Sequence, residues 1–138
     1  MEILIKLISV TLIISLIVFP IFILNQLYNR KAKHIFISYF IISLIITFLL
    51  ILSIAWWSNF SKMLLLTHYG YDFDDMNNIE RFRNVAPENL AKAKNLRISI
   101  MGIGWPLKAF MSYTFYFPYL LIVYFVFVFI QRAKTKKF

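Results

Sequence analysis

The sequence predicts an all-α membrane protein in which three transmembrane helices are accompanied by a structured extracytoplasmic loop with one or two short interfacial helices. Hydrophobic residues make up 61% of the 138 residues, and the mean hydropathy is +0.73, far above the values of soluble domains. A water-soluble domain of this length leaves too large a share of its surface exposed to hide so many apolar side chains. These side chains are concentrated in three uncharged stretches that are long enough to span a bilayer. We therefore expect a single membrane domain, residues 1–138.

The first predicted span covers residues 7–27. Its core, from Leu7 to Leu24, carries no charge, and the uncharged run continues to Asn29. A secretory signal peptide is the alternative, but the residues before the span have almost no net positive charge and no small-residue cleavage site follows it. A retained signal anchor is the favoured interpretation.

The second predicted span covers residues 35–57. It contains no charged side chain, and at about 1.5 Å per residue it forms a helix roughly 34 Å long. Trp56 and Trp57 close the span, because tryptophan favours the boundary between lipid and water. Ser43 and Thr47 lie one turn apart, an arrangement that permits close approach of another helix and an interhelical hydrogen bond. Hydrogen bonds back to their own helix are an equally good interpretation of these hydroxyls.

The third predicted span covers residues 107–130 and is rich in aromatic side chains. Among these, Tyr113, Tyr116 and Tyr119 are candidate interface residues, because amphipathic aromatic side chains anchor protein interfaces. Pro118 predicts a kink, since proline removes a backbone donor and crowds the preceding turn. Alternating residues near the end of the span would also fit a strand, but three isolated strands cannot close a barrel.

The positive charges beside the spans predict how the chain is oriented. The link between the first two spans contains Arg30, Lys31 and Lys33 without an acid, and the basic tail of residues 131–138 also contains no acid. Such clusters stay in the cytoplasm, which places the N-terminus outside and the C-terminus in the cytoplasm. The loop of residues 58–106 also carries cations, but long translocated segments follow the charge rule less closely. The expected location is the bacterial inner (plasma) membrane.

The outer loop, residues 58–106, is too long for an unstructured connection in a compact protein. Ser61 is expected to cap a short helix that ends at Gly70, whose apolar residues either lie in the membrane interface or extend the second span. A second, amphipathic helix is expected to begin at Pro87, because proline suits the first helical position. Its apolar side consists of Leu90, Ala93, Leu96 and Ile100. This side either lies in the membrane interface or packs on the protein's own spans, and the pattern alone favours neither.

The loop ends in a glycine-containing turn that leads back into the membrane. We interpret this turn as a hinge rather than an anion site or a close helix contact. The predicted hinge residues here are Gly102, Gly104 and Pro106. Aromatic residues of the loop are further candidates for contacts with a partner, and these are Tyr69, Tyr71 and Trp105.

An acidic, amide-rich stretch of the loop contains the oxygen ligands that calcium prefers. Its candidate ligands are Asp72, Asp74, Asn77, Asn78 and Glu80. Their spacing departs from the alternating pattern of an EF-hand loop, because Met76 and Ile79 interrupt it. We favour a solvated acidic turn that pairs with Arg81 or Arg83.

The remaining residues predict no catalytic, cofactor or metal site, so we do not expect an enzyme. No ionisable side chain lies deep within a span, where the working groups of membrane enzymes and transporters usually lie. His34 and His68 fall on opposite predicted faces, and the chain contains no cysteine. The net charge of +9 comes from cations beside the spans rather than from one basic face, so no nucleic-acid partner is expected.

Three functional hypotheses follow from these features. The leading one is a small multi-pass accessory or scaffolding subunit of a secretion, transport or respiratory assembly, because interface-forming aromatic residues are abundant. Its expected partners are the lipid bilayer and other membrane protein subunits, with a homo-oligomer as an alternative. A second hypothesis is a self-associating pore former, since the layout of spans and termini is similar to that of one class of phage holin. The third is a membrane immunity or inhibitor protein whose outer loop recognises a toxin.

Overall fold

The computed structural model describes residues 1–31 and 33–135, and this part of the chain is built from helices and turns without a strand. Its elements in chain order are α1 (Glu2–Asn29), α2 (Ile35–His68), α3 (Asn78–Arg81), the 3-10 helix η1 (Pro87–Asn89), α4 (Leu90–Met101) and α5 (Trp105–Thr135). The helices α1, α2 and α5 are each long and apolar enough to cross a membrane. The predictions of an all-α fold and of three long apolar helices are therefore confirmed.

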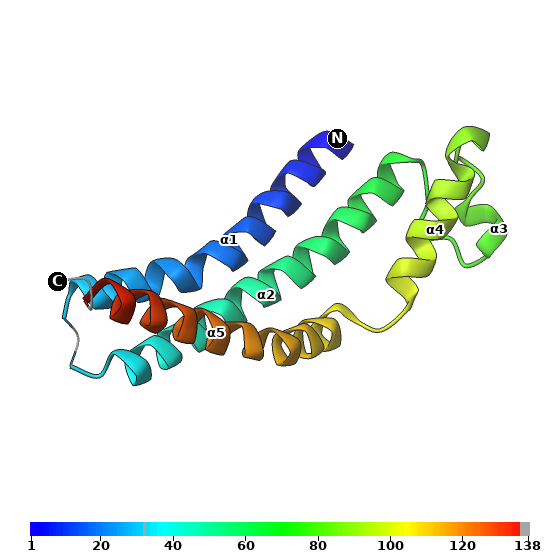
Figure 1. The fold of residues 1–138 in the computed structure, drawn as a ribbon. Coiled ribbons are helices and arrows are strands. Elements are labelled where there is room, and N and C mark those ends of the chain that lie inside the picture. Colours follow the sequence, from blue (N-terminus) through cyan, green and yellow to red (C-terminus); the bar gives the residue numbers. More distant parts are fainter. Residues whose placement is uncertain (32, 136–138) are drawn as a thin grey trace.

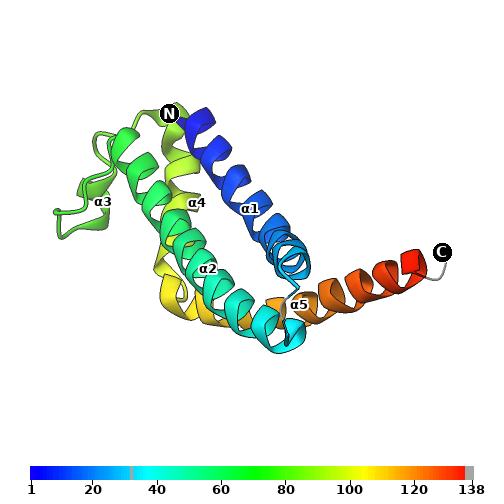
Figure 2. The same cartoon turned by 90° about the vertical axis from the view of Figure 1, so that its left-hand side faces the viewer.

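The long helices form an antiparallel hairpin of α1 and α2, and α5 crosses this hairpin obliquely (Figures 1 and 2). The N-terminus lies near the last turns of α2 and the cap, which we define as residues 69–104 (Figure 1). The α1–α2 link and the last turns of α5 lie toward the opposite end of the bundle (Figure 1). Residues 136–138 of the predicted basic tail lie outside the described part of the chain.

Helix α2 is uninterrupted, which corrects the prediction of a separate short helix after the second span. The span was expected to close at Trp57, but α2 continues to His68 because no glycine or proline interrupts residues 35–68. Ser61, the expected N-cap of the separate helix, is buried within α2, and its hydroxyl donates to the carbonyl of Ser58 at 3.3 Å. The alternative in which these residues extend the second span is confirmed.

The predicted helix end at Gly70 is confirmed and has the geometry of a Schellman motif. Gly70 has a φ of +89°, a left-handed conformation that residues with a Cβ rarely adopt. Its N–H donates to the carbonyl of Thr67 at 3.0 Å, and the N–H of Tyr71 donates to the carbonyl of Leu66 at 3.0 Å. The side chains of Tyr71 and Leu66 are both buried in one cluster, so the turn that ends α2 also begins the core of the cap.

One stripe of α2 faces the other two long helices. It consists of Tyr39, Ser43, Thr47 and Ile51, which follow one another at intervals of one helical turn and are all buried. The hydroxyl of Thr47 donates to the carbonyl of Ser43, so the interpretation in which Thr47 bonds back to its own helix is confirmed. The small side chains of Ser43 and Thr47 are fully buried, which allows close packing along this stripe.

Two tyrosine hydroxyls join α2 to α5. Tyr39 is fully buried, and its hydroxyl donates to the carbonyl of Leu120 at 3.1 Å while its ring stacks against Tyr124. In the other direction, the hydroxyl of Tyr113 donates to the carbonyl of Leu44 at 3.0 Å. Each helix therefore donates one hydrogen bond to the backbone of the other, and the aromatic rings fill the space between them.

Two further tyrosines of α5 bind the backbone of α1, one of them where a proline interrupts the helical hydrogen bonds. Pro20 lies buried within α1 and has no N–H, so the carbonyl of Leu16 lacks its usual donor one turn later. The hydroxyl of Tyr116 takes the place of this donor at 2.6 Å from the Leu16 oxygen. The hydroxyl of Tyr119 donates to the neighbouring carbonyl of Ile17 at 2.9 Å.

The carbonyl of Leu16 lacks a helical donor and that of Ile17 has one, so removal of the Tyr116 and Tyr119 hydroxyls is expected to have unequal effects on stability. Tyr116→Phe is expected to lower the free energy of unfolding by about 1.5 kcal/mol, near the upper end for interhelical hydrogen bonds in membrane proteins. Tyr119→Phe is the matched control and is expected to cost about 0.6 kcal/mol or less, because the Ile17 carbonyl keeps its own helical donor. Unfolding in mixed micelles by titration with sodium dodecyl sulfate, followed by circular dichroism, measures both values. Equal losses would show that Tyr116 does not compensate for Pro20.

Candidate binding site in the cap

The cap has a small apolar core of its own, built on the last turns of α2. Its buried residues are Leu66, Tyr71, Val85 and Ala93. Leu90, Leu96 and Ile100 of α4 pack against this cluster, so the predicted apolar face of α4 is confirmed. The structure shows the packing of α4 on the protein's own long helix, whereas a position of α4 in the membrane interface stays a prediction.

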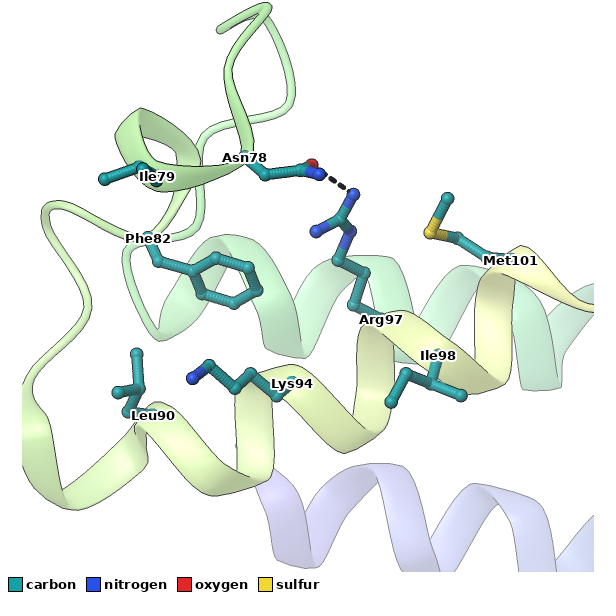
Figure 3. Close-up of a pocket in the computed structure, with 8 residues that line it drawn as sticks. All are labelled: Asn78, Ile79, Phe82, Leu90, Lys94, Arg97, Ile98 and Met101. Carbon is teal, nitrogen blue, oxygen red and sulfur yellow. Dashed lines mark hydrogen bonds between the residues drawn. The ribbon is translucent and has the colours of Figure 1, made fainter.

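An open pocket of about 590 Å³ lies on another face of the cap, between α3 and α4 (Figure 3). Its lining residues are Asn78, Ile79, Phe82, Leu90, Lys94, Arg97, Ile98 and Met101. Three of the apolar side chains are mainly solvent-exposed: Ile79 at 81%, Ile98 at 71% and Met101 at 68%. Exposed apolar side chains that gather in a hollow are typical of a binding site.

Arg97 fixes the shape of this pocket by joining α4 to the segment that contains α3. Its guanidinium donates to the side-chain oxygen of Asn78 (Figure 3) and lies over two aromatic rings, 5.7 Å from the ring centre of Phe82 and 6.0 Å from that of Tyr71. A cation over the face of an aromatic ring is stabilised by the negative charge of that face. Lys94, one turn before Arg97 on α4, adds a second positive charge to the pocket.

The acidic stretch before α3 is organised by hydrogen bonds to its own backbone. The Oδ1 atom of Asp72 accepts the N–H of Asp74 at 2.9 Å, and the side chain of Asn77 caps α3 by accepting the N–H of Ile79. The Arg81 side chain, expected to pair with a carboxylate, donates its Nε–H to a main-chain carbonyl in this stretch. Within the described residues, no group of three His, Asp or Glu side chains is placed to hold a metal ion.

Two predicted contact residues, one in α2 and one at the start of the cap, bind α1. The indole N–H of Trp57 donates to the hydroxyl of Ser9 at 3.2 Å. The hydroxyl of Tyr69 donates to the carboxylate of Glu2, and this hydrogen bond raises the pKa of the Tyr69 phenol above its usual value. Trp56, by contrast, is 49% exposed. The structure therefore uses Trp57 and Tyr69 within the chain and leaves Trp56 on the surface.

Most of the other candidate interface residues also make contacts within the chain. Tyr71 lies in the cap core, and Tyr113, Tyr116 and Tyr119 face the other long helices, so all four make contacts within the chain. Trp105 is half-buried at the first position of α5. A role for these residues in binding a partner stays a prediction.

The predicted hinge occupies the connection between α4 and α5. Helix α4 ends at Met101 and α5 begins at Trp105, so Gly102 and Gly104 lie between them and Pro106 lies in the first turn of α5. A Cβ atom on Gly102 would have no neighbour within 4 Å, so packing does not require glycine there. Helix α5 continues through Pro118. Movement at the hinge and a kink at Pro118 stay predictions.

The sequence does not identify the pocket in the cap, although it contains a signal for it. Ile98 and Met101 of α4 lie outside the apolar face that packs on α2, and they form a second apolar face beside it. The opposite wall comes from Ile79, which the sequence shows only as an interruption of the acidic stretch. In comparisons with known proteins, the chain matches no family model, no curated protein and no solved structure.

Proposed function

We propose that this chain is an integral membrane protein that serves as an accessory or scaffolding subunit of a larger membrane assembly and holds a partner at the cap pocket. The pocket is the observation that carries the proposal, because its exposed apolar walls and two cations suit binding rather than catalysis. An amphipathic segment of a partner fits it, with apolar side chains against Ile79 and Ile98 and acidic side chains near Lys94 and Arg97.

Membrane insertion is supported by the outer surface of the long helices. Apolar side chains cover it, including Ile3 at 82%, Phe115 at 80% and Phe129 at 76% exposure. Water surrounds such a surface only at a large free-energy cost, which lipid removes. The packing between the three helices is completed by tyrosines that donate to backbone carbonyls, an arrangement suited to a medium without competing water.

The proposed orientation places the cap outside and the α1–α2 link in the cytoplasm. Trp57 donates to Ser9, which lies in the part of α1 that follows the N-terminus, and Trp105 begins α5 directly after the cap, so both tryptophans are placed to meet the lipid headgroups on the side of the cap. Arg132 and Lys134 lie in the last turn of α5, toward the end that carries the link. Positive charges at that end favour the cytoplasmic side, and we propose the plasma membrane of a bacterium as the location.

A comparison of two surface variants of the cap tests the proposed role. Ile98→Asp places a charge in the pocket, and Met76→Asp places the same charge on a cap residue that is 99% exposed and does not line the pocket. Proteins are purified in mild detergent from the cells that naturally contain them, and the mass of each complex is measured by native mass spectrometry. The unchanged chain and Met76→Asp are expected to retain the same partner, whereas Ile98→Asp is expected to reduce the retained fraction at least about tenfold, the effect of losing one interface anchor.

Three results would contradict the proposed role. A monomer without any partner would remove its main support, and so would equal retention by both variants. A complex that contains only copies of this chain would favour the self-associating alternative. Extraction of the unchanged chain from membranes by alkaline carbonate would contradict membrane insertion itself.

A further inference from the structure

A second crevice lies between the three long helices near the cap end and has a volume of about 310 Å³. Leu16 of α1 and Ile51 and Ile54 of α2 form its apolar walls. Ser58 of α2 and two residues of α5, Lys108 and Ser112, add polar groups. The crevice is therefore amphipathic, with its polar groups contributed by α2 and α5.

The positive charge beside this crevice is larger than Lys108 alone provides. Lys62 lies one helical turn after Ser58 on α2, so it follows the face of the helix that lines the crevice. The helices α2, α4 and α5 contain no acidic residue that could neutralise either lysine. The Nζ atom of Lys108 donates to the main-chain oxygen of Ser99 at 3.3 Å, a neutral partner. Two neighbouring ammonium groups without a carboxylate between them are stabilised when an anion binds both.

We propose that this crevice binds an anionic phospholipid, with the phosphate between Lys62 and Lys108 and one acyl chain along Leu16, Ile51 and Ile54. The hydroxyls of Ser58 and Ser112 supply additional donors for the headgroup. The inference rests on the proposed membrane insertion, in which the cap end of the bundle lies at the level of the headgroups. Cations that flank a crevice between membrane helices are suited to anionic headgroups, and apolar walls below them are suited to acyl chains.

Retention of lipid by the purified chain tests this site. The full chain is reconstituted in vesicles of equal parts phosphatidylglycerol and phosphatidylcholine, extracted in mild detergent and examined by native mass spectrometry. The unchanged chain is expected to retain phosphatidylglycerol in preference to phosphatidylcholine. In the double variant Lys62→Gln, Lys108→Gln, the preference for phosphatidylglycerol is expected to fall about five-fold for each lysine removed. This factor is the contribution of one basic residue at an anionic membrane surface. The control Arg83→Gln, Lys92→Gln removes two positive charges from exposed cap positions outside both sites and is expected to behave as the unchanged chain.

A second variant tests the acyl-chain part of the proposal without changing charge. Ala55 also lines the crevice, and Ala55→Trp is expected to fill it and to lower lipid retention with both lysines intact. Excess inorganic phosphate is expected to leave the lipid bound, because phosphate has no acyl chain; displacement by phosphate alone would overturn the assignment to a lipid. Equal retention of the two lipids by the unchanged chain, or unchanged preference in the double lysine variant, would also overturn it. These outcomes leave membrane insertion standing, since carbonate extraction measures insertion separately.

Discussion

Tyr39→Ala is expected to lower the free energy of unfolding by about 3 to 5 kcal/mol, the range for removal of a large buried aromatic side chain. Tyr39 is completely buried: its accessible fraction is 0%, and it packs in a cluster that includes residues of α5. The substitution removes the ring that stacks on Tyr124 and the hydroxyl that donates to the carbonyl of Leu120. Association of helices in a membrane depends on such packing, so α5 is expected to separate from the hairpin at a lower concentration of denaturing detergent.

The control for this prediction is Phe129→Ala. Phe129 is also an aromatic residue of a long helix, but 76% of its side chain is exposed, so its removal leaves no cavity between the helices. The control is expected to change the unfolding free energy by less than about 0.5 kcal/mol. Titration with sodium dodecyl sulfate compares both variants with the unchanged chain. Similar losses for Tyr39→Ala and Phe129→Ala would contradict the packing of α5 on α2.

Gly70→Ala is expected to have the second largest effect and to act mainly on the cap. The φ of +89° at Gly70 costs a residue with a Cβ about 1 to 2 kcal/mol. In addition, the new Cβ would lie 2.6 Å from the main-chain oxygen of Asn84, which is too close without a shift of the backbone. We therefore expect a loss of more than about 2 kcal/mol in the stability of the cap. Faster hydrogen exchange in α4 would report this loss, because α4 packs on the cluster that begins at the turn.

Gly102→Ala is the matched control. Gly102 has a negative φ of −72°, and a Cβ there would meet no atom within 4 Å. Alanine reduces the conformational freedom of the unfolded chain, so this variant is expected to be neutral or more stable by up to about 1 kcal/mol. Increased exchange in α4 of both variants, by the same amount, would show that the effect of Gly70→Ala does not come from its backbone conformation.

The long helices could be predicted from the sequence because their signal is uniform. Each is an uncharged run of apolar residues, and length alone decides whether such a run can span a bilayer. The continuity of α2 was harder to predict, since Trp56 and Trp57 suggested that the span had stopped and Ser61 suggested a new N-cap. Helix formation does not depend on polarity in this way, and the first residue with a strong preference against the helix is Gly70. The end of the helix was therefore predictable, whereas its continuity beyond Trp57 was not.

The pocket in the cap could not be predicted because it forms between segments that are separate in the sequence. The apolar face of α4 that packs on α2 could be predicted, because residues on one face of a helix recur in the sequence with the period of that helix. Ile79 lines the pocket opposite α4, and Arg97 joins its segment to α4 through contacts with Asn78 and Phe82. A hydrogen bond between residues of two segments leaves no periodic trace in either of them.

The role of Tyr116 shows a similar limit. The sequence marks it as an aromatic residue suited to an interface, and the structure places it at an interface within the chain. Its partner is a backbone carbonyl left without a donor by Pro20, 96 positions earlier in the chain. A backbone group carries no side-chain signal, so the pairing becomes visible only when the helices are placed side by side.

The continuity of α2 also determines how the cap and the bundle affect each other mechanically. On one side, the cap is attached through an unbroken helix that extends from Ile35 to His68, and on the other side through three residues that belong to no helix, 102–104. A load applied at the cap would therefore tilt the α1–α2 hairpin as one lever. Residues 102–104 provide no helical continuity toward α5, so we expect the cap to keep its orientation relative to α2 rather than to α5.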